Sequence, residues 1–362
     1  MYSPLRYAGH IFWKRRPVQL TFFVTRRCNA GCPFCFYRRK GDAQPLSEPE
    51  LALDEVERLA PFVGRLLWLA FSGGEPFMRE DIVDISRIFY RHAKPSIMLI
   101  STNGLMPEAI AERTEEILRD CPRTTVVVKL SLDGVGEAHD VLRGSPGSFD
   151  KVMRTYGLLG ELTGKYSNFE LGMNTVFCPE NENEMEEIFD FTRGLKRLRT
   201  HTLSLVRGEV RDSGPKALDL NKYREAAGRL EADIRGRSQT GYRFFGAGLK
   251  SAQDILQRRY IYETISAGKR LIPCYAGALN LVLTETGEVY PCEMLSRRMG
   301  SVRDYDYDMR ALVRSDEARS AVGRIRATEC HCSHECYFMT NILFNPRLYP
   351  ALLRESLKLE SQ

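Results

Sequence analysis

The stretch VQLTFFVTRRCNAGCPFC, residues 18–35, joins a mostly apolar run to three closely spaced cysteines. The apolar run predicts a buried β-strand. Cys28, Cys32 and Cys35 follow it with the spacing Cys-x3-Cys-x2-Cys, in a loop whose glycine and proline favour a tight turn. Three thiolates are one ligand short of a closed metal site. The fourth ligand must therefore come from elsewhere in the chain or from a bound molecule.

The alternation of apolar runs and helical patterns continues to residue 206. Such near-continuous apolar strands, joined by helices, are typical of a parallel sheet buried on both faces. We expect strands at 18–25, 66–71, 97–101, 125–132, 169–177 and 201–206, and helices near 48–60, 80–92, 107–119, 148–162 and 182–196. The sequence therefore predicts an α/β fold, a partial (βα)6 TIM-like barrel, with its active groups at the carboxyl ends of the strands.

Polar motifs follow the expected strands where such a barrel would place its site. SGGEP begins at Ser72 after the second strand, STNG begins at Ser101 after the third, and SLDG begins at Ser131 after the fourth. Asn174 lies late in the fifth strand. Because parallel strands end at the same edge of the sheet, we expect these motifs to meet the cysteine loop.

The motif CNAGCPFC, with an aromatic residue before its third cysteine, and the SGGEP segment together resemble the radical SAM enzyme superfamily. The resemblance extends over residues 18–206 in motif and strand order. It implies that Cys28, Cys32 and Cys35 hold a [4Fe-4S] cluster, whose open iron binds S-adenosylmethionine (SAM). It also implies reductive cleavage of SAM to a 5′-deoxyadenosyl radical, which abstracts a hydrogen atom from an unactivated C–H bond. The alternative for these cysteines is a zinc site.

The resemblance assigns SAM-binding roles to residues at the strand ends. Gly73, Gly74 and Glu75 resemble the segment that binds the methionyl amino group, with Glu75 supplying negative charge. Ser131 and Arg143, in the run SLDG…HD…RG…GSF, are candidates for the carboxylate or ribose, since an arginine fork suits a carboxylate.

Five further residues have implied or alternative roles. Asn103 and Asn174 are candidate ribose or carboxylate contacts, and Phe34 and Tyr37 are expected to border the adenine. Cys178, just past the fifth strand, is the candidate hydrogen donor if the enzyme is a radical epimerase. A small buried residue is the plainer interpretation of Cys178.

Five more cysteines lie near the C-terminus. Cys274 and Cys292 are spaced as Cys-x12-Gly-x4-Cys across a predicted hairpin, and the motif CHCSHEC supplies Cys330, Cys332 and Cys336. The pattern is similar to SPASM and twitch extensions, whose cysteines bind auxiliary [4Fe-4S] clusters. A full SPASM extension needs seven cysteines and this chain has five, so we expect one auxiliary cluster on four of them. A structural zinc knuckle is the competing interpretation.

Composition and charge narrow the remaining choices. The 362 residues carry a net charge of +5, yet residues 1–40 hold nine cations and no acid. Without a signal peptide or an apolar span, we expect a cytoplasmic protein. The basic N-terminus suits peripheral membrane contact, closure of the barrel bottom or docking of an acidic electron donor such as ferredoxin or flavodoxin. We expect no nucleic-acid partner.

The pattern also suggests a division of the chain. We expect a basic N-terminal arm, a radical SAM partial barrel, a helical connector, an auxiliary-cluster region and a C-terminal tail at 1–17, 18–210, 211–272, 273–340 and 341–362. We expect the short segment before Cys28 to leave no room for a leader-peptide-binding domain.

The predicted activity is that of a radical SAM oxidoreductase or maturase. An auxiliary Fe–S cluster would support oxidation or bond formation on a peptide or small-molecule substrate. The alternatives are the radical epimerase and, outside catalysis, a zinc- or cluster-binding scaffold or electron carrier. The scaffold would leave SGGEP and the barrel layout without a use.

Overall fold

A single sheet forms the centre of the computed structural model, which describes residues 1–14, 16–37, 48–208, 218–236, 241–244, 246–294, 297–328 and 330–360. Within these ranges the strand order is β6-β5-β4-β3-β2-β1-β7-β8-β9. The first six strands are parallel and lie in chain order. They are β1 (Gln19–Thr25), β2 (Trp68–Gly73), β3 (Ile97–Thr102), β4 (Thr125–Ser131), β5 (Phe169–Phe177) and β6 (Thr200–Leu205).

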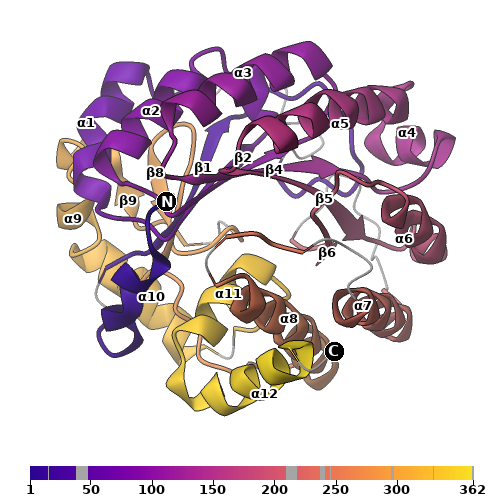
Figure 1. The fold of residues 1–362 in the computed structure, drawn as a ribbon. Coiled ribbons are helices and arrows are strands. Elements are labelled where there is room, and N and C mark those ends of the chain that lie inside the picture. Colours follow the sequence, from indigo (N-terminus) through magenta and orange to yellow (C-terminus); the bar gives the residue numbers. More distant parts are fainter. Residues whose placement is uncertain are drawn as a thin grey trace.

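Helices from the crossover connections cover one face of this sheet (Figure 1). Their apolar sides pack on the strands to form the largest hydrophobic core. They are α1 (Leu53–Val63), α2 (Ile82–His92), α3 (Pro107–Asp120), α5 (Ser148–Lys165) and α6 (Met185–Arg193). Two short elements, η2 (Pro76–Met78) and α4 (Glu137–Arg143), follow strands β2 and β4.

The second half of the chain covers the opposite, concave face. Helix α8 (Ala247–Ala267) packs against α7 (Leu220–Arg235), α11 (Glu335–Leu343) and α12 (Tyr349–Glu360). Figure 1 shows α8, α11 and α12 across the sheet from α2 and α3. The 3-10 helix η4 (Pro346–Leu348) joins α11 to α12. The interior between sheet and α8 is thereby closed off from one side.

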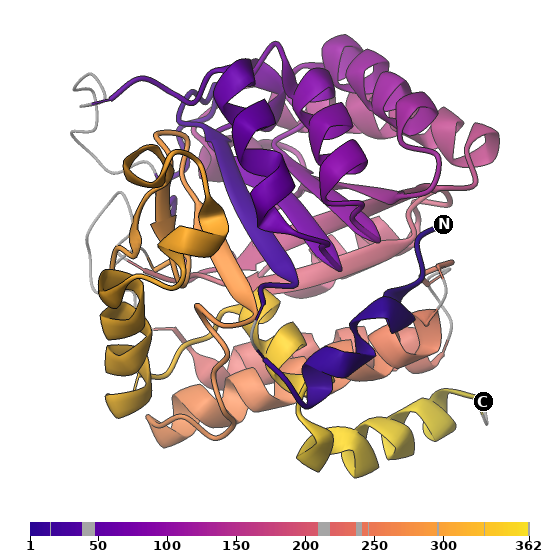
Figure 2. The same cartoon turned by 90° about the vertical axis from the view of Figure 1, so that its left-hand side faces the viewer.

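The C-terminal hairpin extends the same sheet. Strand β7 (Asn280–Leu283) pairs in parallel with β1, and β8 (Glu288–Tyr290) and β9 (Gly300–Ser301) continue as antiparallel strands. Figure 2 shows the orange β7 beside the indigo β1. The chain then forms η3 (Val302–Tyr305), α9 (Met309–Leu312) and α10 (Asp316–Ala327). The first cysteine motif follows β1, and the C-terminal hairpin begins with β7, which pairs with β1. Both cysteine-rich regions of the chain are therefore connected to this part of the sheet.

The predicted α/β fold with a parallel sheet is confirmed, and each predicted strand lies within two residues of an observed one. Local patterning did not indicate that the hairpin would join β1, or that α4 and α12 would form. The predicted domain boundary near residue 210 lies outside the described residues, as do Arg15 and residues 38–40 of the basic N-terminus. The domain division stays a prediction.

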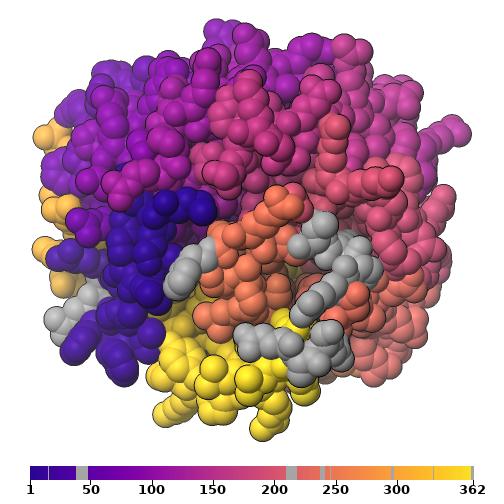
Figure 3. Space-filling model, viewed as in Figure 1, coloured from indigo at the N-terminus to yellow at the C-terminus, as the bar shows by residue number. Residues whose placement is uncertain are grey.

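The N-terminal arm lies across the amino ends of the strands. In η1 (Pro4–Ile11), the buried Tyr7 donates a hydrogen bond to the Leu66 carbonyl, and Arg6 donates to the Lys94 carbonyl at 2.9 Å. The arm borders an apolar cavity with Trp68 and the start of α8. Figure 3 shows the indigo arm beside the orange start of α8. Among the described helices, none is long and apolar enough to span a membrane.

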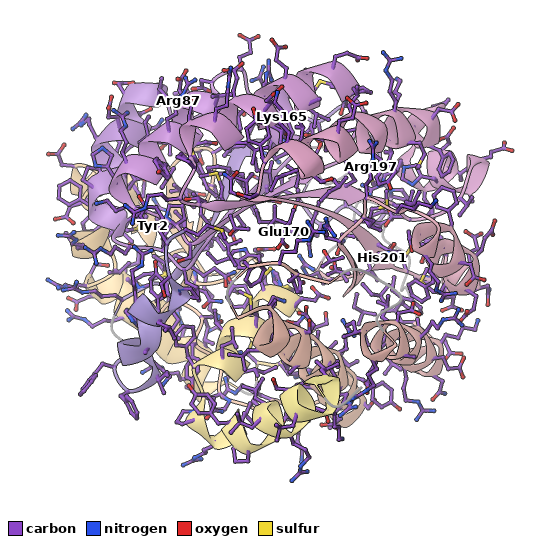
Figure 4. All side chains as sticks on the ribbon, in the orientation of Figure 1. Tyr2, Arg87, Lys165, Glu170, Arg197 and His201 are labelled. Atoms are coloured by element: carbon purple, nitrogen blue, oxygen red, sulfur yellow. The ribbon has the colours of Figure 1, made fainter. Side chains whose placement is uncertain are left out.

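The segment 241–244 also lies at this end of the barrel. Glu170 on β5 accepts a hydrogen bond from the Arg243 backbone N–H at 2.7 Å. In Figure 4, Glu170 and His201 lie on the strands, whereas Arg87 and Lys165 lie among the outer helices. His201 is bonded through both ring nitrogens to threonine hydroxyls, which fits a core histidine.

Candidate functional site

The cysteine loop leaves the carboxyl end of β1 and is fixed against helix α4. The Gly31 N–H donates to the Arg143 carbonyl at 2.8 Å. Gly144 ends α4 with φ +56°, and a Cβ there would lie 2.9 Å from the Gly31 carbonyl oxygen. A side chain at this position would push the two segments apart. The glycine after Arg143 therefore permits the close approach of α4 to the loop.

The SLDG…HD…RG…GSF run supports that contact from behind. Asp140 accepts hydrogen bonds from the Gly147 and Phe149 N–H groups and from the Ser148 hydroxyl, at 2.6–2.8 Å. His139 is buried and its Nδ1 accepts from the Asp133 N–H at 3.2 Å. Asp140 and Ser148 thus fix the turn between α4 and α5, and His139 fixes the connection between β4 and α4.

Arg143 is the member that reaches the cysteines. Its guanidinium forms a buried ion pair with Asp133, and its Nη1 donates to the Cys32 Sγ at 3.6 Å. Burial raises the pKa of the Cys32 thiol, and the adjacent guanidinium counteracts this. Two nitrogens of the fork predicted to bind the cofactor's carboxylate or ribose therefore contact Asp133 and Cys32, whereas its Nε has no partner among the described residues. The position of the guanidinium indicates stabilisation of a thiolate.

The glycines of SGGEP bring β2 close to the residues before the loop. The Gly74 N–H donates to the Thr25 carbonyl at 2.7 Å, and the Glu75 N–H donates to the Arg27 carbonyl at 2.8 Å. A Cβ on Gly73 would lie 2.6 Å from the Thr25 carbonyl oxygen, and one on Gly74 would overlap the Arg27 carbonyl. Only glycine fits at either position without displacing backbone.

Glu75 is a buried carboxylate at the junction of β2 and β3. Its oxygens accept hydrogen bonds from the Thr102 hydroxyl at 2.8 Å and from the Asn103 and Phe77 N–H groups at 2.7 and 3.1 Å. Burial raises its pKa to about 7, although these donors favour the ionised form. A bound cation beside it would restore the charged state, as the predicted ammonium of SAM requires.

Asn103 and Asn174 take different positions along the site. The Asn103 side chain donates to the Cys28 Sγ at 3.7 Å and to the Asn29 Oδ1 at 2.7 Å, so it supports the cysteine loop. The Asn174 Oδ1 accepts from Thr202 and Ser204 at 2.9 and 3.0 Å. Its side chain is therefore oriented by β6.

One cavity brings together most of the predicted residues. The cysteine cavity has a volume of about 210 Å³, and its lining includes eleven predicted residues. These are Cys28, Cys32, Phe34, Cys35, Gly73, Gly74, Glu75, Asn103, Ser131, Arg143 and Asn174. The donor set of three thiols, two N–H groups directed at sulfur and an adjacent carboxylate fits a cluster with a bound cationic ligand.

The aromatic border of this cavity differs from the prediction at one residue. Phe34 and Phe36 line it, whereas Tyr37 is absent from its lining. The Tyr37 ring packs on Phe23 with centroids 4.4 Å apart, and its hydroxyl bonds to Glu285 in the hairpin turn. Phe36 and Arg207, whose guanidinium lies 5.1 Å from the Phe36 ring, were not indicated by the motifs.

A second cavity continues from the first toward the amino ends of the strands. The barrel cavity, of about 180 Å³, lies between the concave face of the sheet and α8 and α11. The two cavities share six lining residues, most of them with short side chains, at the inward positions of the strands. These are Ser72, Ser101, Ser131, Asn174, Ser204 and Arg207. A molecule in the barrel cavity would face the cysteine cavity across this boundary.

Four of the five C-terminal thiols interact with one another. Burial raises the pKa of Cys292 to about 12, and Cys332, Cys274 and Cys330 add to the rise. Burial likewise raises the pKa of Cys332 to about 11, with Cys274 and Cys330 contributing. Mutual repulsion of this kind is relieved when thiolates bind metal.

Cys336 packs with Cys274 and Cys292 around Tyr337, but it also borders the barrel cavity. It lies in the first turn of α11 and lines the barrel cavity. Its charged neighbours are Glu293, Arg207, Glu335 and Lys129. Among the described side chains, no three Cys, His, Asp or Glu residues are gathered closely enough to hold a single metal ion. A four-iron cluster spreads its ligands over a wider volume than one ion does.

Arg207 connects the cysteine-bearing segments of the C-terminal region. It pairs with Glu293, next to Cys292, and with Glu335, next to Cys336, each at 3.1 Å. Glu293 also accepts from the Thr21 hydroxyl of β1 at 3.1 Å. This buried network joins β1, the hairpin and α11 beside both cavities.

Cys178 lies outside the linings of the cysteine and barrel cavities. Its N–H donates to the Asn181 Oδ1 at 3.0 Å, and the side chain is fully buried in an apolar cluster with Cys32, Phe34 and Leu142. Burial raises the pKa of this thiol above its usual range. The structure thus does not bring the predicted hydrogen donor to the space where a substrate would lie.

This site and fold belong to a known class of enzyme. Residues 22–192 match the Radical SAM superfamily. The superfamily predicted from the cysteine motif is thereby confirmed. The match implies an enzyme that uses a [4Fe-4S] cluster and SAM.

Individual relatives and solved structures have low sequence identity to this chain. The chain is 26% identical over 295 residues to the AdoMet-dependent heme synthase of Nitratidesulfovibrio vulgaris, covering 78% of this chain and 75% of that protein. Native anSMEcpe with bound AdoMet has a similar fold, with a TM-score of 0.58, 18% identity, and coverage of 95% and 99% of the two chains. Streptococcus suis SuiB bound to its precursor peptide SuiA matches with a TM-score of 0.59 and 17% identity, covering 88% and 69%.

Proposed function

We propose that this enzyme is a radical SAM oxidoreductase of the maturase type, acting on an unactivated C–H bond of a peptide or small molecule. The observation that carries the proposal is the convergence of Cys28, Cys32 and Cys35 with the segment Gly73–Glu75 on one cavity. That cavity opens to a second one, which is suited to a substrate. A zinc scaffold would leave this pair of cavities without a use.

Cys28, Cys32 and Cys35 would hold the cluster, and with SAM bound it would supply the reductive chemistry that removes a hydrogen atom from the substrate. The chain's residues hold and orient these groups. Arg143 and Asn103 direct N–H donors at the Cys32 and Cys28 sulfurs and so favour thiolates. Glu75 provides the negative charge for the amino group of SAM.

The remaining walls orient the other end of SAM and exclude water. Phe34, Phe36 and Val176 give the cysteine cavity an apolar side suited to the adenine. Ser131 and Asn174 lie at the boundary of both cavities, where hydroxyl and amide groups can bind the ribose. Such positioning directs the reactive carbon of SAM toward the barrel cavity.

We assign the auxiliary [4Fe-4S] cluster to Cys274, Cys292, Cys330 and Cys332. Their mutual electrostatic contacts support this choice, and Cys336 faces the barrel cavity instead. The Arg207 network joins the segments next to Cys292 and Cys336 to strand β1, which leads into the first cysteine group. A cluster there would provide an acceptor for the electron that the substrate loses in a net oxidation or bond formation. The separate electron needed at the first cluster would come from ferredoxin or flavodoxin.

The proposal includes two classes of substrate, a small molecule and a peptide. The heme synthase relative favours a small molecule, and the SuiB complex favours a peptide. Peripheral membrane contact through the N-terminus and a cytoplasmic location stay predictions. Phe12 and Trp13 are exposed there, at 72% and 67%.

The activity itself has a direct test. After anaerobic reconstitution with iron and sulfide, dithionite and SAM are expected to yield 5′-deoxyadenosine and methionine without added substrate. Liquid chromatography with mass detection measures both products. Reconstituted protein that binds about four irons at the first site yet forms no 5′-deoxyadenosine would contradict the proposal.

The auxiliary assignment predicts different outcomes for two neighbouring cysteines. Wild-type protein is expected to bind about eight irons and eight sulfides. Cys332→Ala should lower both to about four, because a ligand of the second cluster is lost, whereas Cys336→Ala should retain about eight. Iron and sulfide analysis with Mössbauer spectroscopy measures the content. Zinc at this site, or equal losses in both variants, would show that the assignment is wrong.

A further inference from the structure

The barrel cavity contains a buried cation that the proposed function has not used. Arg258 on α8 lines this cavity and is only 4% exposed. Its Nε and Nη2 atoms have no hydrogen-bond partner in the described part of the chain. A buried guanidinium with unsatisfied donors is costly unless a ligand or ordered water completes its hydrogen bonds.

A second cation lines the cavity from the facing sheet. Lys129 lies on β4, two residues before Ser131, so both side chains lie on the same face of the strand. Its ammonium donates to the Thr202 hydroxyl at 3.0 Å. Neither Lys129 nor Arg258 forms an ion pair with a carboxylate of the residues described here.

The carboxylates around this cavity already have partners. Asp254 accepts from Lys250 and, at 2.9 Å, from the Tyr242 hydroxyl. Glu293 and Glu335 pair with Arg207. The wall therefore carries four cations, namely Lys129, Arg207, Lys250 and Arg258, against three carboxylates. The excess positive charge lies with the two cations that lack an acidic partner.

We propose that Arg258 and Lys129 bind a carboxylate group of the substrate in the barrel cavity. The planar fork of arginine matches a carboxylate through two parallel hydrogen bonds, and the lysine adds a second positive charge. This inference rests on the proposed function, because it names the substrate class of that same site. It identifies the substrate as an organic acid or a peptide carrying an acidic group.

The position of the pair also bears on which carbon reacts. Lys129 lies deeper in the barrel than Ser131, by about two strand residues or roughly 7 Å. Ser131 is at the boundary shared with the cysteine cavity. A substrate held by its carboxylate at Arg258 would therefore present a carbon on its far side to the boundary. Binding at a remote group fixes the reacting C–H bond in this way.

The test uses benzoate as a probe, because a single ring with one carboxylate suits a cavity of about 180 Å³. Isothermal titration calorimetry is performed on anaerobically reconstituted, SAM-loaded protein with benzoate, benzamide and inorganic phosphate. We expect benzoate to bind about tenfold or more tightly than benzamide, since only the acid forms charge-assisted hydrogen bonds. We expect phosphate to bind more weakly than benzoate.

Variants locate the binding. Arg258→Gln and Lys129→Met are each expected to weaken benzoate binding about tenfold or more and to reduce its preference over benzamide. Arg258→Lys should keep part of the benzoate affinity. Arg259→Gln is the matched control, because Arg259 is the next residue of α8 and is exposed. It should bind benzoate as wild type does. Circular dichroism identifies any variant that fails to fold. If Arg258→Gln fails to fold, benzoate binding by Lys129→Met decides whether the proposed site is correct.

Several results would overturn the inference. They are absent benzoate binding, equal binding of benzamide, tighter binding of phosphate, or unchanged benzoate affinity in both Arg258→Gln and Lys129→Met. The calorimetric readout needs no SAM cleavage. Benzoate binding without 5′-deoxyadenosine formation would therefore refute the proposed function alone, and the reverse result would refute this inference alone.

Discussion

Replacing Cys28, Cys32 and Cys35 together by alanine is expected to abolish 5′-deoxyadenosine formation. The three thiols line one cavity, and removing them leaves the cluster without protein ligands. Bound iron should fall from about eight to about four per chain, because the auxiliary site is built from other residues. Product analysis and iron analysis on the same reconstituted sample measure both effects.

A matched control separates loss of ligands from general damage. Cys121 is fully buried between α3 and β4, on the helical side of the sheet, and packs in the main core. Cys121→Ala is expected to keep about eight irons and the activity of the wild type. Product formation by the triple variant would contradict the assignment of the cofactor site. A loss of iron in Cys121→Ala as large as that in the triple variant would also contradict it.

Gly74→Ala is expected to lower 5′-deoxyadenosine formation at least about tenfold, although alanine carries no reactive group. The added methyl group would overlap the Arg27 carbonyl, so the backbone that leads into Cys28 must move. Gly74 is not among the glycines with positive φ, and lack of space is therefore the whole cause. Overpacking of this kind costs about 1–3 kcal/mol in the free energy of unfolding.

The control for this substitution is Gly157→Ala. Gly157 lies within α5, and a Cβ there would meet no atom within 4 Å. Alanine in a helix interior is expected to stabilise the fold by about 0.5–1 kcal/mol and to leave the activity unchanged. Chemical denaturation and the 5′-deoxyadenosine assay measure the pair. Wild-type activity and iron content in Gly74→Ala would show that this close approach is dispensable.

Much of the barrel could be predicted because its strands carry their own signal. A parallel strand covered on both faces is mostly apolar and fully buried, as residues 19–25 are. The positions of the motifs after the strands then placed them at one edge. Cys28, Gly74 and Arg143 meet around one cavity for that reason.

Other features depended on contacts that no local pattern contains. Phe36 and Tyr37 are adjacent aromatic residues, and the path of the loop decides which of them faces the cavity. Cys178 has the same parity as Asn174 and Val176, yet β5 ends at Phe177 and the turn bonded to Asn181 directs the chain elsewhere. Strand alternation no longer applies beyond the end of a strand.

The barrel cavity was the least predictable part. Lys129 lies in a strand, Arg258 in a helix of the connector, and Arg207 in a segment after β6. Each is an ordinary charged residue in its local sequence. Their shared environment appears only when α8 packs across the concave face of the sheet.

The pairing of β7 with β1 has a consequence for how the enzyme is made. Gln19 pairs with Asn280, roughly 260 positions later, so a ribosome must synthesise most of the chain before β1 gains its second neighbour. Until then the nascent barrel exposes an apolar strand edge, which is prone to aggregation. Chaperone protection during translation would suit a protein in which β1 is made long before β7, the strand that covers its edge.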